Sequence, residues 1–372
     1  MKLIKIEQNT TAFTATWSDQ SSDELPFIWL RDNDPHEFHP DTGERTFDLT
    51  GVALNIQPQS YQLEDAGQQE LVIVWPNKAE PSRYSAEWLT AHRPGKPRYD
   101  PALIEKKAWS AADMSSLARF SAKDCEDNAK ALKNALCTLK STGIIVIDGL
   151  EDDLSAGEKF GDLIGFKRET NFGVVFEVKS KPDPNNLAYT SLTLPLHTDL
   201  ANQEFIPGNQ FLHCYRNDAT GGDSVFADAM TILDEFKHEC PEQYQLLTEL
   251  AVPWHFRDQQ TDLRQHRPII GLDSNGKFKS LTFNAHIADI PDFDAQTLHL
   301  FYAAYRELMC RIRSAKHTIE YKLKNGEMVI FDNQRVLHGR TSFDPESGAR
   351  HLRGYYIEHN EIENRIRMLG NL

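Results

Sequence analysis

Cysteine is scarce in this 372-residue sequence and follows no pattern. The five cysteines, at positions 125, 137, 214, 240 and 310, are odd in number and include no C-x-x-C pair. They therefore provide neither a disulfide framework nor a thiolate metal motif. We predict five reduced, mostly buried thiols in a cytoplasmic protein, because disulfides persist mainly in oxidising compartments.

Long apolar runs and positive charge are also lacking. The N-terminal stretch MKLIKIEQNTTAFTATW has no apolar core of signal-peptide length, and no later stretch is long enough to span a bilayer. Lys and Arg number 40 against 55 Asp and Glu, which gives a net charge of -15. This balance argues against a nucleic-acid partner and against a polybasic membrane surface. It does not identify the substrate, because a local basic pocket can lie inside an acidic protein.

The segments that are present divide into two parts. Residues 1–95 contain the short runs KLIKIE, AFTATW, VALNIQ and LVIVW between polar turns, which predict a small β-rich N-terminal domain. The following HRPGKPRYDP has three prolines and a glycine, a composition typical of a linker. We place the domain boundary there, with the second domain at 96–372.

The second part predicts many short strands with helices outside them. Helical spacing over 122–141 precedes the buried strand GIIVIDGL and a further helix over 155–166. Strands dominate from position 185, interrupted by helices near 228–249 and 294–315. The predicted fold class is mainly β with flanking helices, and the second domain is predicted to be a double-stranded β-helix, or jelly roll.

One short stretch, LPLHTDL, suggests a metal site. His197 and Asp199 stand two residues apart where a strand pattern ends, so their side chains should project to one face. A third ligand type, His338, follows a strand and a turn in FDNQRVLHGR and is expected in a second, half-buried strand. Two histidines and one carboxylate are the ligand set of non-haem Fe(II) oxygenases. Each of these residues alone would more simply be a structural residue.

Arg350 makes the iron interpretation stronger. It lies twelve residues after His338, in a stretch expected to run as a strand beside the His338 strand. Arginine is a bidentate partner for carboxylates, so it could hold the far carboxylate of a 2-oxo acid that chelates iron. A zinc hydrolase built on the same three ligands would need no such clamp, and a binding protein without turnover would not need the complete set.

With these motifs in hand, the sequence resembles the Fe(II)/2-oxoglutarate-dependent dioxygenases of the taurine dioxygenase superfamily, in the γ-butyrobetaine and trimethyllysine hydroxylase branch. The resembling stretches span nearly the whole chain: WLRDN, YSAEWL, NNLAYT, LPLHTDL, FLHCYRNDATGGDS, FDNQRVLHGR and RHLRGYY.

The resemblance implies a role for each matching residue. His197, Asp199 and His338 would ligate Fe(II), and Arg350 with Ser224 would bind 2-oxoglutarate. Arg353 would support the C1 carboxylate, although a structural arginine is equally consistent with the sequence. The implied cofactors and co-substrates are Fe(II), 2-oxoglutarate and O2, with ascorbate as reductant in vitro. A homodimer is plausible by the same resemblance.

The resemblance also implies an aromatic cage for a trimethylammonium group, which would use cation–π attraction. The matching cage positions are Phe172, Phe176, Tyr189, Leu200 and Tyr356. Asn186 matches an asparagine that holds the carboxylate of the small-molecule substrate, and Asn284 lies where another polar contact is expected. Phe172 and Phe176 replace a tyrosine and a tryptophan, and Leu200 replaces a tyrosine. Core packing is the alternative for each aromatic residue. We expect a γ-butyrobetaine-like quaternary ammonium acid, with a trimethylammonium phosphonate or another small zwitterion or organic acid as alternatives. Desaturation or bond cleavage could replace hydroxylation.

Relatives of this branch often carry a zinc site in the N-terminal domain. Its four ligand positions correspond here to Asp34, His36, His39 and Glu80, with no thiolate among them. One interpretation is a changed site with nitrogen and oxygen ligands. The other, which we favour, is a site that has lost its metal, so zinc is not expected.

Overall fold

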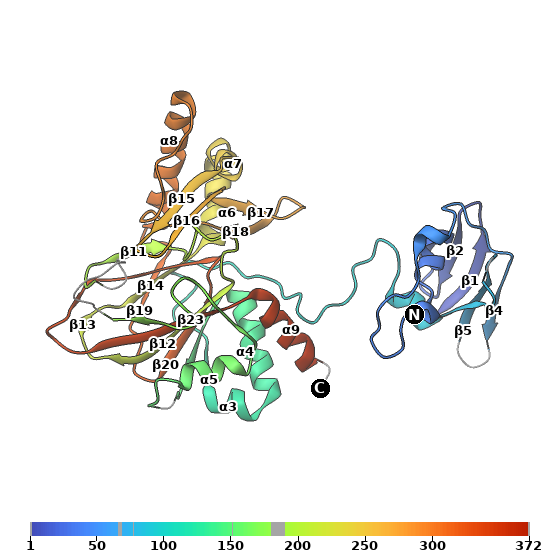
Figure 1. Ribbon diagram of the computed structural model, residues 1–372, viewed down its shortest axis with the longest axis horizontal. Coiled ribbons are helices and arrows are strands. Elements are labelled where there is room, and N and C mark those ends of the chain that lie inside the picture. The colour runs from blue at the N-terminus through green and yellow to red at the C-terminus, as the bar shows by residue number, and fades with distance from the viewer. Residues whose placement is uncertain (1, 66–68, 77, 151, 180–189, 371–372) are drawn as a thin grey trace. The chain divides into compact units, whose positions relative to one another are not determined.

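The computed structural model describes residues 2–65, 69–76, 78–150, 152–179 and 190–370 (Figure 1). The chain forms two compact units, Met1–Asp100 and Pro101–Leu372. The division lies five residues beyond the predicted boundary at residue 95, within the same proline-rich stretch. Along the part of the chain that the structure describes, no helix is long and apolar enough to cross a membrane.

The N-terminal unit contains two three-stranded antiparallel sheets. The first comprises β1 (Leu3–Gln8), β2 (Ala12–Trp17) and β3 (Ser22–Pro26), and the second β4 (Ser60–Asp65), β5 (Gln69–Val74) and β6 (Ser82–Ser85). The helices α1 (Phe27–Asp32) and α2 (Ala86–Ala91) follow β3 and β6, and the short turns η1 (Pro35–Glu37) and η2 (Leu49–Gly51) lie between the sheets in sequence.

The core of this unit is aromatic, with Phe13, Trp17, Trp75 and Tyr84 almost fully buried. The strand predicted over VALNIQ is wrong: only Ile56 is buried there, and the chain turns instead. An alternating pattern makes a strand only where a neighbouring strand is available for pairing.

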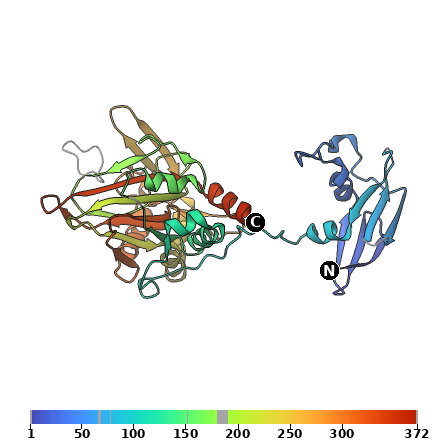
Figure 2. The same cartoon turned by 90° about the horizontal axis from the view of Figure 1, so that it is seen from below.

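The larger unit is built on two facing sheets (Figure 2). The large sheet has seven strands in the described residues: β7 (Arg119–Ser121), β8 (Ile144–Asp148), β9 (Lys167–Arg168), β10 (Phe176–Val178), β12 (Asn209–Asn217), β20 (Glu327–Asp332) and β23 (Arg350–Ile357). The small sheet has the order β11 (Leu194–His197), β21 (Val336–Arg340), β14 (Ser224–Asp228), β19 (Thr318–Tyr321). Three two-stranded ribbons complete the unit: β13 (Thr220–Gly221) with β22 (Phe343–Asp344), β15 (Val252–Arg257) with β16 (Asp262–Arg267), and β17 (Ile270–Leu272) with β18 (Phe278–Leu281).

A cluster of apolar side chains fills the space between the two sheets. It joins Phe226 and Val336 of the small sheet to Val329, Phe331 and Leu352 of the large one. Side chains that alternate along each strand supply this layer with every second residue. The predicted jelly-roll fold is therefore confirmed.

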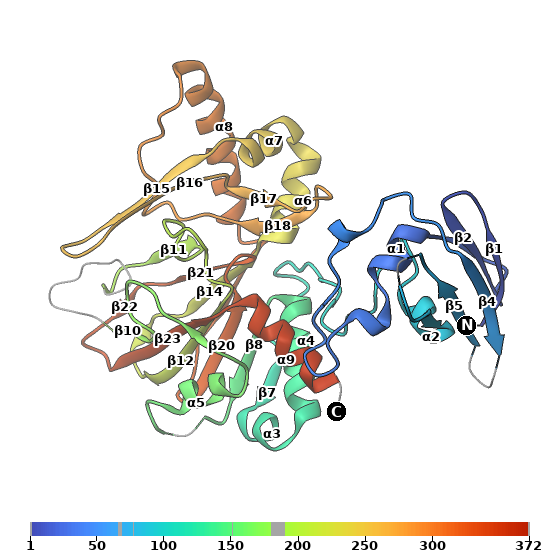
Figure 3. The same cartoon turned by 45° about the vertical axis from the view of Figure 1, so that its right-hand side comes forward.

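Helices cover the outside of the sheets, as expected (Figure 3). The outer face of the large sheet packs against α3 (Ala122–Asp127), α4 (Ala129–Thr142), α5 (Ala156–Asp162) and α9 (His359–Gly370). A separate cluster packs α6 (Ala229–Glu239), α7 (Pro241–Glu249) and α8 (Ala295–Ile312) against the small sheet and its adjoining ribbons. The two predicted helical insertions near 228–249 and 294–315 are thus present.

Three details differ from the sequence prediction. The helix expected over 122–141 is divided at Asn128, whose side chain accepts from the backbone N–H of Lys130 and Ala131 and so starts a second helix. The strand of His338, β21, is fully buried rather than half-buried. All five cysteines are free, but only Cys125 and Cys214 are buried, and Cys310 is exposed.

Candidate metal centre

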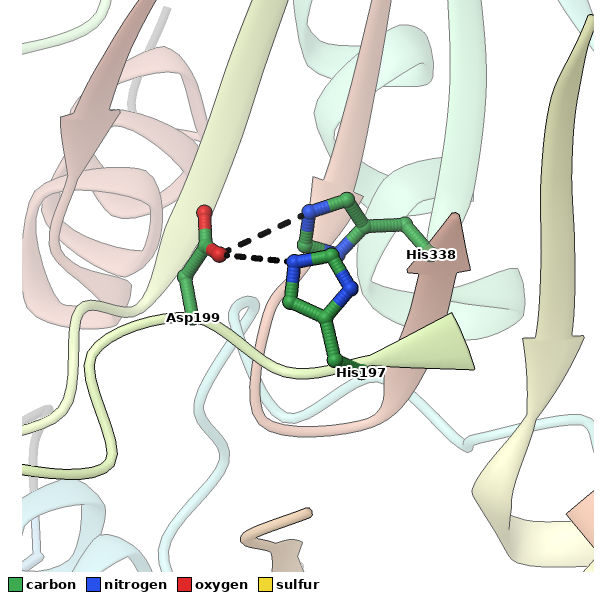
Figure 4. Close-up of side chains that lie close together, drawn as sticks. All are labelled: His197, Asp199 and His338. Carbon is green, nitrogen blue, oxygen red and sulfur yellow. Dashed lines mark ion pairs between the residues drawn. The ribbon is translucent and has the colours of Figure 1, made fainter. Parts of the chain in front are cut away.

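His197, Asp199 and His338 lie together where the edge strand of the small sheet, β11, ends (Figure 4). His197 ends β11 and is the direct cross-strand partner of His338 on β21, which brings their rings to 4.2 Å between centroids. Asp199 Oδ1 lies 3.2 Å from His197 Nε2 and 3.7 Å from His338 Nε2. In the described residues this is the one group of three or more His, Cys, Asp or Glu side chains close enough to share a metal ion.

The geometry of the His-x-Asp stretch follows from its alternation. Thr198, between the two ligands, points away and bonds with the backbone of Phe283 through its N–H, 2.7 Å from the carbonyl oxygen. His197 and Asp199 consequently share the opposite side, as the sequence spacing predicted. The next residue, Leu200, has a φ of +59°, a conformation that non-glycine residues rarely adopt, and it ends the extended run.

Asn333 fixes the backbone of Asp199. Its side-chain Oδ1 accepts from the Asp199 N–H at 2.7 Å, and its Nδ2 donates to the carbonyls of Asp199 and Pro207, both at 3.2 Å. Asn333 is fully buried in the turn between β20 and β21, five residues before His338. The turn that leads to His338 therefore also holds Asp199. The sequence did not predict this role of Asn333, because residue type alone does not reveal it.

The electrostatics of the three groups favour a metal-ready state. Burial lowers the pKa of His338 to about 3, assisted by the neighbouring His197. Burial alone would raise the pKa of Asp199, but His338, His197 and the Tyr356 hydroxyl hold it below its ordinary value. His197 Nδ1 lies 2.9 Å from the Pro195 carbonyl oxygen, which as an acceptor places the proton on Nδ1 and leaves the Nε2 lone pair free. Neutral imidazole nitrogens and a carboxylate are the forms that bind metal ions.

Two of the predicted cage aromatics meet beside this carboxylate. The Tyr356 hydroxyl donates to Asp199 Oδ2 at 2.7 Å, and the Tyr356 ring lies 5.4 Å from that of Phe176. Phe176 pairs across the strands with Gly354, where a Cβ atom would lie 2.4 Å from the Phe176 ring. The missing side chain at Gly354 thus makes room for the aromatic pair.

Arg350 lies at the first residue of β23, but that strand does not run beside the His338 strand. It belongs to the large sheet, between β10 and β12, whereas β21 lies in the small sheet. The prediction of adjacent strands is wrong, because a jelly roll places consecutive strands in opposite sheets.

The Arg350 guanidinium nevertheless has unused hydrogen-bonding capacity. Its Nε and Nη1 are buried and have no hydrogen-bond partner among the described residues. Its Cζ lies 5.4 Å from the Phe343 ring centroid, and burial lowers its pKa. Gly222 lies against it, where a Cβ atom would stand 2.9 Å from Nε, and its φ of +72° also favours glycine. Buried donors without partners are costly, so this position suits an anionic ligand.

The remaining predicted residues lie in different surroundings. Ser224 is buried on β14 opposite Arg340, and Leu200 is buried beside Asp199 in sequence. Asn284 is buried and donates to the Thr198 carbonyl at 3.2 Å, so it supports the strand end. Phe172 packs edge-on against Phe256, 5.5 Å between centroids.

Asn186 and Tyr189 lie outside the described residues. Arg353 occupies the face of β23 opposite to Tyr356, where it pairs with Glu158 at 2.8 Å and Glu177 at 2.9 Å. The structure thus does not bring Arg353 to the metal ligands, because neighbouring strand residues point to opposite faces.

The four candidate positions in the N-terminal unit do not gather around one point. The buried Asp34 carboxylate is bound instead by the Lys78 ammonium and the Ser82 hydroxyl. His36 Nδ1 lies 3.4 Å from Asp34, but its side chain is 61% exposed, and His39 and Glu80 are exposed too. An ammonium group thus neutralises the carboxylate here.

A jelly roll with a His-Asp-His group beside the edge strand of one sheet, together with a half-buried arginine that has two buried, unpaired nitrogens, defines a non-haem iron oxygenase that uses 2-oxoglutarate. The particular family follows from sequence comparison. Residues 107–356 match the taurine catabolism dioxygenase TauD, TfdA family, and residues 4–90 match the γ-butyrobetaine hydroxylase-like N-terminal family. The chain belongs to the TauD, TfdA family and is an Fe(II)/2-oxoglutarate-dependent dioxygenase.

Similar proteins extend over both units. The γ-butyrobetaine dioxygenase of Pseudomonas sp. (strain AK-1) is 35% identical, over 96% of this chain and 93% of that protein. The γ-butyrobetaine dioxygenase of Homo sapiens is 30% identical, over 95% and 93%. A solved structure of asparagine oxygenase in complex with Fe(II), 2S,3S-3-hydroxyasparagine and succinate has a TM-score of 0.51 at 17% identity, covering 64% of this chain and 83% of that one, and supports the fold alone.

Proposed function

We propose that this dioxygenase hydroxylates an aliphatic C–H bond of a small quaternary ammonium acid, with γ-butyrobetaine as the first candidate. The observation that carries the proposal is the aromatic pair of Phe176 and Tyr356, because the Tyr356 hydroxyl donates to the carboxylate of Asp199. Aromatic faces attract a trimethylammonium group, and the Asp199 carboxylate adds negative charge nearby. The similarity to two γ-butyrobetaine dioxygenases supports this choice.

The roles proposed for the residues follow from their surroundings. His197, Asp199 and His338 would hold Fe(II), which supplies the oxidising chemistry when it is bound with 2-oxoglutarate and O2. Arg350, with its unused donors, would bind the far carboxylate of 2-oxoglutarate, and the buried Ser224 hydroxyl would assist it. By the resemblance to the γ-butyrobetaine branch, Leu200, Phe172 and Asn284 would line the substrate side.

Succinate formation from 2-oxoglutarate tests the proposal, measured under air with Fe(II) and ascorbate over a panel of substrates. The panel holds γ-butyrobetaine, its trimethylammonium phosphonate analogue, trimethyllysine and a sulfonate. Stimulation by γ-butyrobetaine with one hydroxylated product is the expected result. Stimulation by the phosphonate alone would overturn the first candidate and assign the alternative substrate.

The Asp199→Ala variant serves as the negative control in this assay. It should lose substrate-dependent succinate formation at least a thousandfold, while its unfolding curve shows a soluble, folded chain. Activity equal to that of the parent enzyme would remove Asp199 from the ligand set.

We also propose a cytoplasmic location and a homodimer. The five free cysteines support the first, since reduced thiols are typical of reducing compartments. The second rests on the resemblance stated above and is tested by light scattering, which should give twice the chain mass of 42.5 kDa.

A further inference from the structure

The two oxygens of the Asp199 carboxylate have different surroundings. Oδ1 faces the two imidazole Nε2 atoms, at 3.2 and 3.7 Å. Oδ2 accepts the Tyr356 hydroxyl at 2.7 Å. One oxygen is therefore directed to the place of the metal, and the other already has a partner.

The hydrogen bond that engages Oδ2 comes from the opposite sheet. Tyr356 lies on β23 of the large sheet, where Gln210 and Arg168 are its direct cross-strand partners, and only 3% of its surface is exposed. Asp199, by contrast, follows β11 of the small sheet, and Asn333 holds its backbone. With the backbone fixed, the orientation of the carboxylate depends on side-chain rotation, which the Tyr356 hydroxyl restricts.

We propose that Tyr356 is a positioning residue that keeps Asp199 a one-oxygen ligand of the metal. A carboxylate free of this bond could turn and offer both oxygens to the ion. The second oxygen would then occupy a position that a chelating 2-oxo acid requires, since this ligand set works by leaving positions open. Replacing a residue that hydrogen-bonds to a metal ligand commonly lowers metal affinity or activity about 10- to 100-fold.

The proposal separates two functions of one side chain. The ring of Tyr356 lies against Phe176, which is the contact used in the proposed substrate site, whereas its hydroxyl donates to the Asp199 carboxylate. Replacement by phenylalanine removes the hydroxyl and keeps the ring. The inference rests on the proposed iron and 2-oxoglutarate site but not on the identity of the substrate.

Tyr356→Phe is the test, and Tyr355→Phe is its matched control. Tyr355 directly precedes Tyr356 on the same strand and is also buried. Its hydroxyl donates to the Gly157 carbonyl at 2.6 Å, on the outer face of the large sheet. Both variants are loaded anaerobically with Fe(II), and 2-oxoglutarate binding is titrated by the charge-transfer absorption of its chelate, without substrate. The Co(II)-loaded proteins are compared by their visible spectra before 2-oxoglutarate is added.

Tyr356→Phe should weaken 2-oxoglutarate binding about tenfold or more. It should also weaken the Co(II) absorption, because a second carboxylate oxygen raises the coordination number. Tyr355→Phe should bind 2-oxoglutarate like the parent protein and give the parent Co(II) spectrum. A Tyr356→Phe protein with the parent spectrum and parent affinity would overturn the proposal, and so would equal losses in the two variants.

These measurements do not involve the amine substrate. An enzyme that gives the expected difference but hydroxylates no quaternary ammonium acid would refute the proposed substrate and leave the Tyr356 inference standing. An enzyme that hydroxylates γ-butyrobetaine while Tyr356→Phe matches the parent protein would do the reverse.

Discussion

Two guanidinium groups, of the buried Arg340 and the half-buried Arg350, share the Phe343 ring in the larger unit. Arg340 and Arg350 place Cζ 4.9 and 5.4 Å from its centroid. Burial lowers the pKa of Arg340 to about 10, and the charge of Arg350 contributes to the same direction. Two cations held this close are unfavourable without an anion, which is what 2-oxoglutarate would supply.

The first prediction concerns Arg350. Arg350→Ala should raise the KM for 2-oxoglutarate roughly ten- to a hundredfold, because a hydrogen bond to a charged group contributes about 1.5–3 kcal/mol. Steady-state succinate formation at varied 2-oxoglutarate measures this. Arg353→Ala is the matched control, since Arg353 pairs with Glu158 and Glu177 on the other face and should leave that KM unchanged. A raised KM in the control instead would return Arg353 to the cofactor site.

Asn333 gives the second prediction. Asn333→Ala removes three hydrogen bonds around Asp199 and Pro207, so the free energy of unfolding should fall by about 1–3 kcal/mol. Metal affinity, measured by Co(II) titration, should fall about tenfold. Asn209→Ala serves as control, because Asn209 is also buried but its side chain donates to the Ile357 carbonyl instead. An equal loss of Co(II) affinity in both variants would show that general stability, and not the hydrogen bonds between Asn333 and Asp199, sets the metal affinity.

The sequence predicted residue types better than it predicted residue partners. The three ligand positions could be named because their chemistry is specific and their spacing follows strand alternation. Asn333 and the second function of Tyr356 could not be found this way. Their partners lie 134 and 157 residues away in the chain, and asparagine and tyrosine carry no metal-ligand signal.

At the level of elements, an ion pair connects the last helix, α9, to the end of β20, next to the turn that holds Asn333. His359 at the start of α9 lies 2.9 Å from Asp332 Oδ1, the residue before Asn333. Burial would lower the pKa of His359, but the Asp332 carboxylate raises it. Burial would likewise raise the pKa of Asp332, yet His359 brings it down to about 2.

The third prediction is the pH dependence of this pair. A raised imidazole pKa stabilises the fold fully below its ordinary value of 6.5 and loses that effect as pH rises through the folded value. The carboxylate contribution is present above 3.8 and is lost as pH falls through about 2. His359→Gln should therefore lower the free energy of unfolding by about 0.5–1 kcal/mol near pH 5.5. The figure is small because the His359 side chain is 39% exposed and solvent weakens the ion pair. The loss of unfolding free energy should be smaller at about pH 9.

Urea unfolding at the two pH values measures the effect. His299→Gln, at an exposed histidine on α8, provides the comparison. An equal loss at both pH values would contradict the ion-pair explanation.

Elements were predictable where the pattern was local. The helices near 228–249 and 294–315 were found because their apolar periodicity is strong, and β8 because its residues are continuously apolar. The partner of β23 was not, since strand pairing depends on the folding of distant segments. The final helix, α9, was missed because its many charged residues obscure the buried row of Ile362, Ile366 and Leu369.

At the level of the whole molecule, the N-terminal unit neutralises a buried carboxylate, Asp34, with an internal cation, Lys78. Burial would raise the pKa of Asp34, but the hydrogen bonds from Lys78 and Ser82 hold it below its ordinary value. Lys78 lies 44 residues from Asp34 and is no ligand type, so the sequence could not identify it as the partner.

The fourth prediction separates the two units by their response to chelation. EDTA should abolish turnover yet leave the unfolding of the N-terminal unit unchanged, which tryptophan fluorescence reports because Trp17, Trp29, Trp75 and Trp88 are four of the six tryptophans. Lys78→Met should lower the stability of this unit by about 3–5 kcal/mol, since it leaves a buried carboxylate unpaired. Lys5→Met, at a 59% exposed lysine, is the control. Unfolding of the unit by EDTA would restore a metal to it.

The direct pairing of His197 with His338 has one more consequence. β11 is only four residues long and forms the edge of its sheet, so few backbone hydrogen bonds hold it. An ion bound by both imidazoles would cross-link neighbouring strands and so hold the edge strand β11 against the buried strand β21. Saturating Fe(II) should therefore raise the melting temperature and slow amide exchange along β11, by the linkage between ligand binding and folding. The ion would then stabilise the fold around β11 as well as take part in the reaction.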